Sequence, residues 1–533
     1  MLTESIPVSK AINLARTSAR GGFNLFWGVA ASSLISALGV IFVARILSPS
    51  EYGLFAIALI APNIIQIVRD LGIDQATIKY TAQYNQENRP DNIKNVLASA
   101  ITFELLLGSA LSIVSYLLSG FLATNIFNRP ELTPLIQMAS FTIFGHALLK
   151  AAQAAFTGYE KMEYHSTTLI IQSALKAGLM ILLVILGLGA YGAVIGHTTA
   201  YLIAGLTSIL LLYITVYKKL RKENRKLEIF VTIKNLLRYG LPISGSIILN
   251  GFLTQFYSFL IAIYLSDLIV GNYQAAINFS VIVTFFVTPV TTTLFPVFSK
   301  VSPEKEPETL RSVFRSSVKY ASLLVIPATF MLMALSKPAV YTLFGTKYEY
   351  TPLYLALYII FYLYTAFGHL SAGNVLKGQG KTQLHFKITL IKSLVGVILS
   401  LTLIPMFGIF GFLAAHLAAE LPSLTIMLWW IKKHYNVTID WSSSIKILLS
   451  AATAAAITYA VTYVLNLANW ITLIIGAAIF LTAYLVTAPL MGAINHTDIK
   501  NLKEMLRVLG PIVPLLDMPL NIIEKLIATF QKK

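Results

Sequence analysis

The sequence has no cysteine and few charged residues. The absence of cysteine excludes disulfides, iron–sulfur clusters, thiolate zinc sites and cysteine nucleophiles. Only 12% of the 533 residues are charged, about half the fraction found in ordinary soluble domains. Hydrophobic residues make up 56% of the chain, and the mean hydropathy is +0.73. These values exclude a soluble globule of this size and predict a polytopic membrane protein.

Apolar runs of roughly 20 residues, which is the length that crosses a bilayer as a helix, recur about fourteen times. The runs cover residues 22–44, 52–69, 94–119, 131–156, 166–187, 191–217, 239–266, 272–298, 317–338, 351–376, 385–404, 408–430, 445–466 and 470–491. The connections between them are too short for a large soluble domain. We therefore predict an all-α integral membrane protein whose function lies inside the helix bundle.

Acidic residues are also scarce, with 23 against 40 basic residues and a formal net charge of +17. If the N-terminus is cytoplasmic, nearly all basic residues outside the spans lie on the inner side. Those on the outer side are Arg45, Arg129, Lys337 and Lys347. This asymmetry predicts a multi-pass protein of the cell (plasma) membrane with both termini cytoplasmic. Anionic lipid headgroups account for the inner charge, so no nucleic-acid partner is predicted.

Three pairs of short segments indicate an internal duplication. The pairs are 191–197 with 410–416, 158–161 with 378–381, and 51–55 with 269–273, and each is offset by about 220 residues. This offset equals six spans, so the two copies keep the same orientation. Parallel six-span repeats with a site between them are a transporter architecture. We predict two parallel six-helix lobes around a central cavity, plus two extra C-terminal helices.

The predicted organisation follows from these spans. It comprises a cytoplasmic N-terminal segment (1–21), an N-lobe (22–217), a basic cytoplasmic linker (218–238), a C-lobe (239–430), two further spans (431–491) and a cytoplasmic amphipathic tail (492–533).

Ionisable residues at membrane depth are costly and usually mark a pathway. Those in or near the predicted spans are Arg45, Arg69, Asp70, Glu104, Lys150, Lys176, Lys392 and Glu420. Basic groups outnumber acidic ones, which favours an anionic ligand. Lys176 and Lys392 lie well inside the fifth and eleventh spans, and we predict that both line the pathway. Arg45, Arg69 and Lys150 could instead extend to the interface.

The acidic residues of this set have two interpretations. Glu104 and Glu420 are either salt-bridge partners or coupling sites for a proton or cation, and Asp70 is a third candidate for coupling.

No enzyme motif is present. The segment 378–382 resembles a phosphate-binding loop, but Val375 stands where that motif needs its first glycine. Neither a metalloprotease motif nor a nucleophile elbow occurs. We therefore predict a protein that is not an enzyme and needs no cofactor or metal.

Several segments resemble polysaccharide flippases of the multidrug/oligosaccharidyl-lipid/polysaccharide exporter superfamily. They are Ala44–Phe55 (ARILSPSEYGLF), Arg238–Pro242 (RYGLP), Leu294–Ser299 (LFPVFS) and Gly378–Thr382 (GQGKT). Pro62-Asn63, Arg69, Gly72 and Gln75-Ala76 are in addition similar to the lipid II flippase branch. The likeness covers essentially the whole chain. The resemblance implies a cationic cavity for a lipid diphosphate, and it implies that Arg45 and Arg69 bind the anionic headgroup.

The resulting hypothesis is a flippase that translocates a polyprenyl-(pyro)phosphate-linked oligosaccharide from the inner to the outer leaflet by alternating access. Arg45, Arg69, Lys176 and Lys392 would bind the anionic headgroup. The partners would be this lipid, membrane lipids and glycan assembly enzymes. A cation-coupled multidrug or metabolite antiporter of the same fold is the alternative, and an acidic cavity around Glu104 or Glu420 would favour it. A membrane glycan polymerase or ligase and a structural scaffold are further alternatives.

Overall fold

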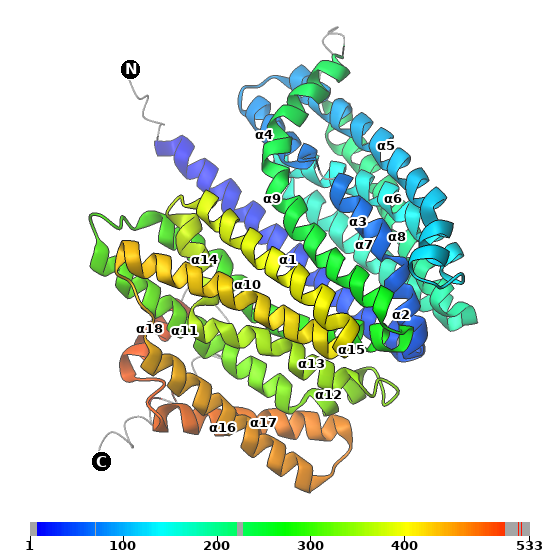
Figure 1. Ribbon diagram of the computed structural model, residues 1–533. Coiled ribbons are helices and arrows are strands. Elements are labelled where there is room, and N and C mark those ends of the chain that lie inside the picture. The colour runs from blue at the N-terminus through cyan, green and yellow to red at the C-terminus, as the bar shows by residue number, and fades with distance from the viewer. Residues whose placement is uncertain (1–7, 70, 221–226, 507–520, 522–523, 525–533) are drawn as a thin grey trace. The chain divides into compact units, whose positions relative to one another are not determined.

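The computed structural model describes residues 8–69, 71–220, 227–506, 521 and 524. All regular secondary structure in this part of the chain is helical (Figure 1), as predicted. The chain divides into two compact units, Met1–Gly271 (unit 1) and Asn272–Lys533 (unit 2).

Within the described residues, unit 1 consists of nine α-helices, three short helical segments and the first turn of a tenth helix. They are α1 (Val8–Ile46), α2 (Pro49–Ala58), α3 (Ile60–Arg69), α4 (Ile73–Gln86), α5 (Pro90–Phe121), η1 (Leu122–Ile126), α6 (Leu132–Gly158), α7 (Met162–Leu183), η2 (Val184–Leu188), α8 (Gly189–Thr215), η3 (Tyr217–Lys219), α9 (Ile229–Tyr264) and the start of α10 (Asp267–Lys300).

Helix α6 packs against α5 and α8 in unit 1, and α1 packs along α7. Small residues make the α6–α8 contact close. A Cβ atom added at Gly145 would lie 2.6 Å from the backbone of Tyr201, and one added at Gly205 would clash with the carbonyl oxygen of Gly145. Van der Waals packing of small residues is a main source of helix association in lipid. It holds α6, which carries several polar side chains, in one position within unit 1.

Unit 2, as far as it is described, contains the rest of α10 and eight further α-helices with one 3₁₀ segment. They are α11 (Pro307–Ala334), α12 (Ser336–Leu343), α13 (Thr351–Ile359), η4 (Ile360–Phe367), α14 (His369–Gly378), α15 (Thr382–Tyr435), α16 (Trp441–Leu465), α17 (Asn469–Leu490) and α18 (His496–Leu506). In Figure 1 they run from green to red.

The core of unit 2 is apolar. Ile326 of α11, Ile447 of α16 and Phe480 of α17 belong to one buried cluster, and α16 and α17 pack side by side (Figure 1). Phe298, Phe314 and other residues form a second cluster, together with residues at the end of α15.

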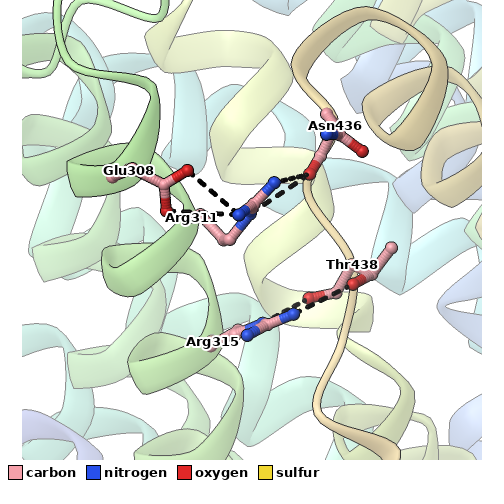
Figure 2. A network of polar contacts seen from close by, with 5 residues as sticks. All are labelled: Glu308, Arg311, Arg315, Asn436 and Thr438. Atoms are coloured by element: carbon pink, nitrogen blue, oxygen red, sulfur yellow. Dashed lines mark hydrogen bonds and ion pairs between the residues drawn. The ribbon is translucent and has the colours of Figure 1, made fainter.

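Two arginines of α11 hold the connection that follows α15 (Figure 2). Arg311 donates hydrogen bonds of 3.2 and 3.3 Å to the carbonyl oxygen of Asn436 and pairs with Glu308 at 3.0 Å. Arg315 bonds the carbonyl and hydroxyl oxygens of Thr438 at 3.3 Å. Because Asn436 has a φ of 51°, α15 ends there in a left-handed cap, and the arginines satisfy carbonyl groups at and beyond it.

Lys319, one turn further along α11, reaches a third segment. Its Nζ lies 2.6 Å from a carboxylate oxygen of Asp498 in α18, and both side chains are largely buried. Asn501 of α18 also donates a 2.8 Å hydrogen bond to the hydroxyl of Tyr320. These contacts fix α18 on α11. The remainder of the predicted tail, apart from residues 521 and 524, lies outside the described residues, as do residues 1–7 and 221–226 of the predicted N-terminal segment and linker.

The predicted spans all fall on helices. Within the described residues, ten helices are long and apolar enough to cross a membrane, or eleven with the bent pair Thr351–Phe367 and His369–Gly378. Two of the ten each contain two predicted spans. A residue with a non-helical backbone conformation, Gly187 in one and Gly408 in the other, separates the two spans. The chain is thus a multi-pass helical membrane protein, while the number of fourteen crossings and the arrangement of lobes stay predictions.

Two turns at the predicted repeat offset have the same backbone hydrogen bonds. Three backbone hydrogen bonds shape the turn after α6. They run from the N–H groups of residues 159, 160 and 161 to the carbonyl oxygens of residues 155, 157 and 156. The turn after α14 has the same bonds, from residues 379, 380 and 381 to residues 375, 377 and 376. The two turns are related by the offset noted in the sequence. Gly189 and Gly408, which are related in the same way, also share unusual dihedral angles, with φ of 53° and 58° and ψ of −137° and −134°. Equivalent turns therefore end equivalent helices.

A reciprocal contact joins two repeat-related glycines. A Cβ atom at Gly53 would clash with the carbonyl oxygen of Asp267, and a Cβ atom at Gly271 would clash with that of Pro49. Gly53 and Gly271 occupy equivalent places in the two predicted repeats, and so do Pro49 and Asp267. The starts of α2 and α10 thus touch backbone to backbone, which any side chain at either glycine would prevent.

The start of α16 predicts an acid-sensitive element of stability. The Asp440 side chain caps this helix, and its hydrogen bond with the Ser443 hydroxyl at 2.6 Å is the main cause that lowers the pKa of Asp440 below its ordinary value of 3.8. A lowered pKa in the folded state stabilises the protein above the unfolded-state pKa, and this contribution is lost as the pH falls through the folded-state value.

We therefore expect Asp440→Asn to reduce the acid dependence of the melting temperature in detergent below about pH 4. Glu304→Gln, which changes an exposed carboxylate, is the matched control. An unchanged acid profile in Asp440→Asn would contradict the role of this cap.

Candidate anion-binding site

A cavity of about 350 Å³ lies within unit 1, between α3, α4, α6, α7 and α9. It is lined by Gln66, Ile67, Arg69, Asp74, Gln75, Ile78, His146, Lys150, Gln153, Ala154, Thr157, His165 and Gly251. Most of these side chains are polar, although most of the chain is apolar. Such a cavity is the expected location of a ligand site in a helical membrane protein.

Helix α6 supplies one wall of the cavity through a stripe of polar side chains. His146, Lys150, Gln153 and Thr157 follow one another at spacings of four, three and four residues, which places them on one face of the helix. Thr157 Oγ1 lies 2.9 Å from His165 Nδ1 of α7. Gln153 donates a 3.3 Å hydrogen bond to Thr168. These bonds fix the orientation of the stripe.

Arg69, at the end of α3, brings a positive charge to the cavity wall. Its guanidinium forms an ion pair with the carboxylate of Glu104 on α5, and both side chains are 2% exposed. A buried charge of this kind is retained only when a partner offsets its desolvation. Glu104 thus neutralises Arg69, and the guanidinium, with its five N–H donors, stays at the cavity wall.

Lys150 is the positive charge of the cavity that has no such partner. Among the residues that the structure describes, no carboxylate lies within ion-pair distance of its ammonium group. The cavity also holds the carboxylate of Asp74 and the imidazoles of His146 and His165. Lys150 thus offers three hydrogen-bond donors and a full charge, which suit a phosphate group.

A line of ring contacts continues from the cavity toward Lys176. The ring of His146 lies 5.6 Å from that of Tyr201, and the ring of Tyr201 lies 5.0 Å from that of His197. Lys176, half-buried on α7, is close enough to His197 to interact with it electrostatically. Lys176 likewise has no carboxylate partner within the described part of the chain. Polar groups therefore extend from Lys150 to Lys176 through unit 1.

The charged residues of unit 2 are arranged differently. Lys392 Nζ lies 2.5 Å from one carboxylate oxygen of Glu420, and His369 Nδ1 lies 2.9 Å from the other. Glu420 is 1% exposed. Lys392 is therefore paired with a buried carboxylate, unlike Lys176.

The structure brings some of the predicted site residues together and separates others. It pairs Arg69 with Glu104 and Lys392 with Glu420, as the salt-bridge interpretation of the two glutamates expected. Arg45 is exposed in the last turn of α1. The 21-residue stretch Pro49–Arg69, about 30 Å of helix, separates it from Arg69, so the two arginines do not share one phosphate. Asp70 lies outside the described residues.

Most of the cavity escapes prediction from sequence. Lys150 is recognisable as a charge at membrane depth, but its position alone does not assign it to the site, and nothing local marks Gln75, Gln153 or His165. The spacing of His146, Lys150, Gln153 and Thr157 along one face of α6 is a signal that could have found Lys150 and Gln153, but it does not reach Gln75 of α4 or His165 of α7. Within the described chain, no cluster of three or more histidine or acidic residues could hold a metal ion.

Residues 42–351, more than half of the chain, match the family described as polysaccharide biosynthesis protein. The chain belongs to the polysaccharide biosynthesis protein family. This assignment confirms the resemblance that the sequence motifs carry.

Two named relatives match the chain over much of their length, and a solved structure has a similar fold. The chain is 24% identical to the probable low-salt glycan biosynthesis flippase Agl15 of Haloferax volcanii over 92% of its own length and 99% of that protein. It is also 24% identical to the lipopolysaccharide biosynthesis protein WzxC of Escherichia coli, over 69% of this chain and 72% of WzxC. Its fold is similar to that of the lipid II flippase MurJ in an inward closed conformation, with a TM-score of 0.68, 17% identity, and coverage of 87% and 98% of the two chains.

Proposed function

We propose that this member of the polysaccharide biosynthesis protein family is a flippase for a polyprenyl-(pyro)phosphate-linked oligosaccharide. It would move this lipid from the inner to the outer leaflet of the cell membrane by alternating access, for the assembly of a cell-surface polysaccharide or glycan. The observation that carries the proposal is Lys150, a lysine without a carboxylate partner among the described residues, in a polar cavity inside an apolar helical unit.

The chemistry of the cavity suits the phosphate part of such a lipid. Lys150 supplies the charge, Arg69 supplies a guanidinium, and Gln75, Gln153 and the two histidines supply neutral hydrogen-bonding groups. Lys176 offers a second positive charge deeper in the predicted span, along the line of rings that begins at His146. We propose that the headgroup moves along these groups while the polyprenyl tail stays in the bilayer.

The predicted topology places this cavity toward the cytoplasm. Lys150 lies eight residues before the inner end of α6, which is about 12 Å of helix. A headgroup in the inner leaflet could therefore reach it without crossing the centre of the membrane. Binding would drive transport only if the inward and outward states bind the headgroup with different affinity. We propose that closure of the protein around a headgroup whose charge is neutralised by lysines provides this difference.

The charge pattern disfavours the antiporter alternative. A transporter of cationic drugs needs an available buried carboxylate. Glu104 and Glu420 are both ion-paired, and the carboxylate of Asp74 shares its cavity with the cationic Arg69 and Lys150. A coupling role for either glutamate would require its pair to open during the cycle.

The proposal is tested by leaflet transfer in proteoliposomes. A fluorescent undecaprenyl-diphosphate trisaccharide should cross the bilayer faster with the purified protein than in protein-free vesicles. The same vesicles should not accumulate a fluorescent cationic drug under a proton or sodium gradient. Drug uptake without transfer of any member of a panel of lipid-linked glycans would reject the flippase and favour the antiporter.

A further inference from the structure

A second cavity, of about 570 Å³, lies in unit 1 between α4, α5 and the start of α9. Three tyrosines, Tyr80, Tyr84 and Tyr239, and three asparagines, Asn92, Asn95 and Asn235, are among the residues that line it. Its volume is within the range of small-molecule sites, about 300–1,000 Å³. The anion-binding cavity and this one have no described lining residue in common.

The tyrosines form a fixed array of rings. The rings of Tyr80 and Tyr84 stack with their centroids 6.1 Å apart. The rings of Tyr80 and Tyr239 meet edge to face, with their centroids 5.7 Å apart. The ammonium group of Lys79 lies 3.9 Å from the centre of the Tyr239 ring. These contacts hold the rings without help from a ligand, so the aromatic wall is preformed.

The asparagines supply hydrogen-bonding groups from α5 and α9. Asn95 donates a 2.8 Å hydrogen bond from its side-chain nitrogen to Thr232 of α9. Its side-chain oxygen is buried and accepts no hydrogen bond from any residue that the structure describes. Asn92 of α5 and Asn235 of α9 also line the cavity and are not buried, so their amide groups are accessible to a ligand hydroxyl.

We propose that this cavity binds a sugar residue of the transported lipid-linked glycan. A pyranose ring presents C–H groups on its faces, which pack against the negative face of an aromatic ring, and hydroxyl groups around its edge. Amide side chains both donate to and accept from hydroxyl groups. The charged residues of the described lining, Glu228 and Arg238, have opposite signs, so the cavity does not select for an anion.

The two cavities lie at different depths along α9. Tyr239 lines the sugar cavity and Gly251 lines the anion-binding cavity, and these positions are twelve residues apart on α9, which corresponds to about 18 Å of helix. In the predicted topology, the sugar cavity is the one nearer the cytoplasm. One ligand could thus place its diphosphate near Lys150 and a sugar near Asn95. This inference rests on the proposed flippase function and names the part of the substrate that the second cavity recognises.

The experiment measures the affinity of the detergent-solubilised protein for undecaprenyl diphosphate alone and for a panel of undecaprenyl-diphosphate trisaccharides that contain hexoses, N-acetylhexosamines or uronic acids. At least one trisaccharide should bind about tenfold more tightly than the sugar-free lipid. Asn95→Leu and Asn235→Leu should each remove most of this gain and leave the affinity for undecaprenyl diphosphate unchanged. Asn125→Leu, on an exposed segment elsewhere in unit 1, is the matched control.

Two results would overturn the inference while leaving the flippase in place. One is that no trisaccharide binds more tightly than undecaprenyl diphosphate, and the other is that both variants keep the full gain. Failure of the proposed function has a different signature, namely trisaccharide binding that depends on Asn95 without any binding of undecaprenyl diphosphate or transfer between leaflets.

Discussion

Lys150→Gln is expected to slow leaflet transfer of a lipid-linked glycan about tenfold to a hundredfold at limiting substrate concentration. The reason is that a hydrogen bond to a charged group contributes about 1.5–3 kcal/mol, and about 1.4 kcal/mol corresponds to a factor of ten. Glutamine keeps much of the length and the polarity of the side chain but removes the charge that would face the phosphate. Transfer of a fluorescent undecaprenyl-diphosphate trisaccharide in proteoliposomes provides the measurement.

The matched control is Lys161→Gln, which removes the same charge from an exposed lysine just beyond the end of α6. It should transfer the lipid like the wild-type protein, and Lys150→Arg should retain more activity than Lys150→Gln. If Lys150→Gln folds normally and transfers the lipid at the wild-type rate, Lys150 does not bind the substrate. Lys176→Gln, tested in the same way, then reports on the deeper lysine alone.

Glu104→Ala is expected to destabilise the protein by about 3–5 kcal/mol, because removal of one partner of a buried ion pair leaves the other charge uncompensated. Arg69 is 2% exposed, so water cannot replace the missing carboxylate without a rearrangement of the helices. The measurement is the melting temperature of the purified protein in detergent, which should fall clearly relative to the wild type. Glu163→Ala, which removes an exposed carboxylate, is the matched control and should leave it unchanged.

A double variant separates the structural role of this pair from a role in binding. Arg69→Leu combined with Glu104→Leu replaces both charges with apolar side chains, and such replacements are often neutral for stability. We expect the double variant to melt near the wild-type temperature but to bind undecaprenyl diphosphate more weakly. Wild-type binding by a stable double variant would show that Arg69 serves only the fold.

Much of the helical fold could be predicted from the sequence because membrane spans impose a simple rule. A backbone in lipid must satisfy its own hydrogen bonds, so an apolar run such as 445–466 becomes a helix, here α16, whatever surrounds it. The similarity of two turns at the predicted repeat offset has a similar basis. The turn after α6 needs a positive φ at Glu160, its equivalent after α14 needs one at Gly380, and such turns leave a recognisable pattern of short segments.

The candidate site was harder to predict because it depends on which helices meet. Arg69 and Glu104 are far apart in the sequence, and nothing in their local sequence indicates that α3 and α5 bring them together. The same holds for Lys392, which the sequence presents as an available cation and which the structure pairs with Glu420. For Lys150 the sequence misleads in the opposite direction. A lysine near a span end suggests a side chain that extends to the membrane interface, whereas the structure places Lys150 in the cavity with other polar residues of α6.

The contacts of α11 with Asn436, Thr438 and Asp498 have a consequence for how the protein is made. They hold both ends of the α16–α17 hairpin, since one segment precedes Trp441 and the other follows Leu490. Ribosomes deliver the chain from its N-terminus, so the arginine contacts can form first and the contact of Lys319 with Asp498 only after α18 has emerged. Helices α16 and α17 are thus tethered at one end before α18 is made and held at the other end once it has emerged, which makes the emergence of α18 the step that closes unit 2.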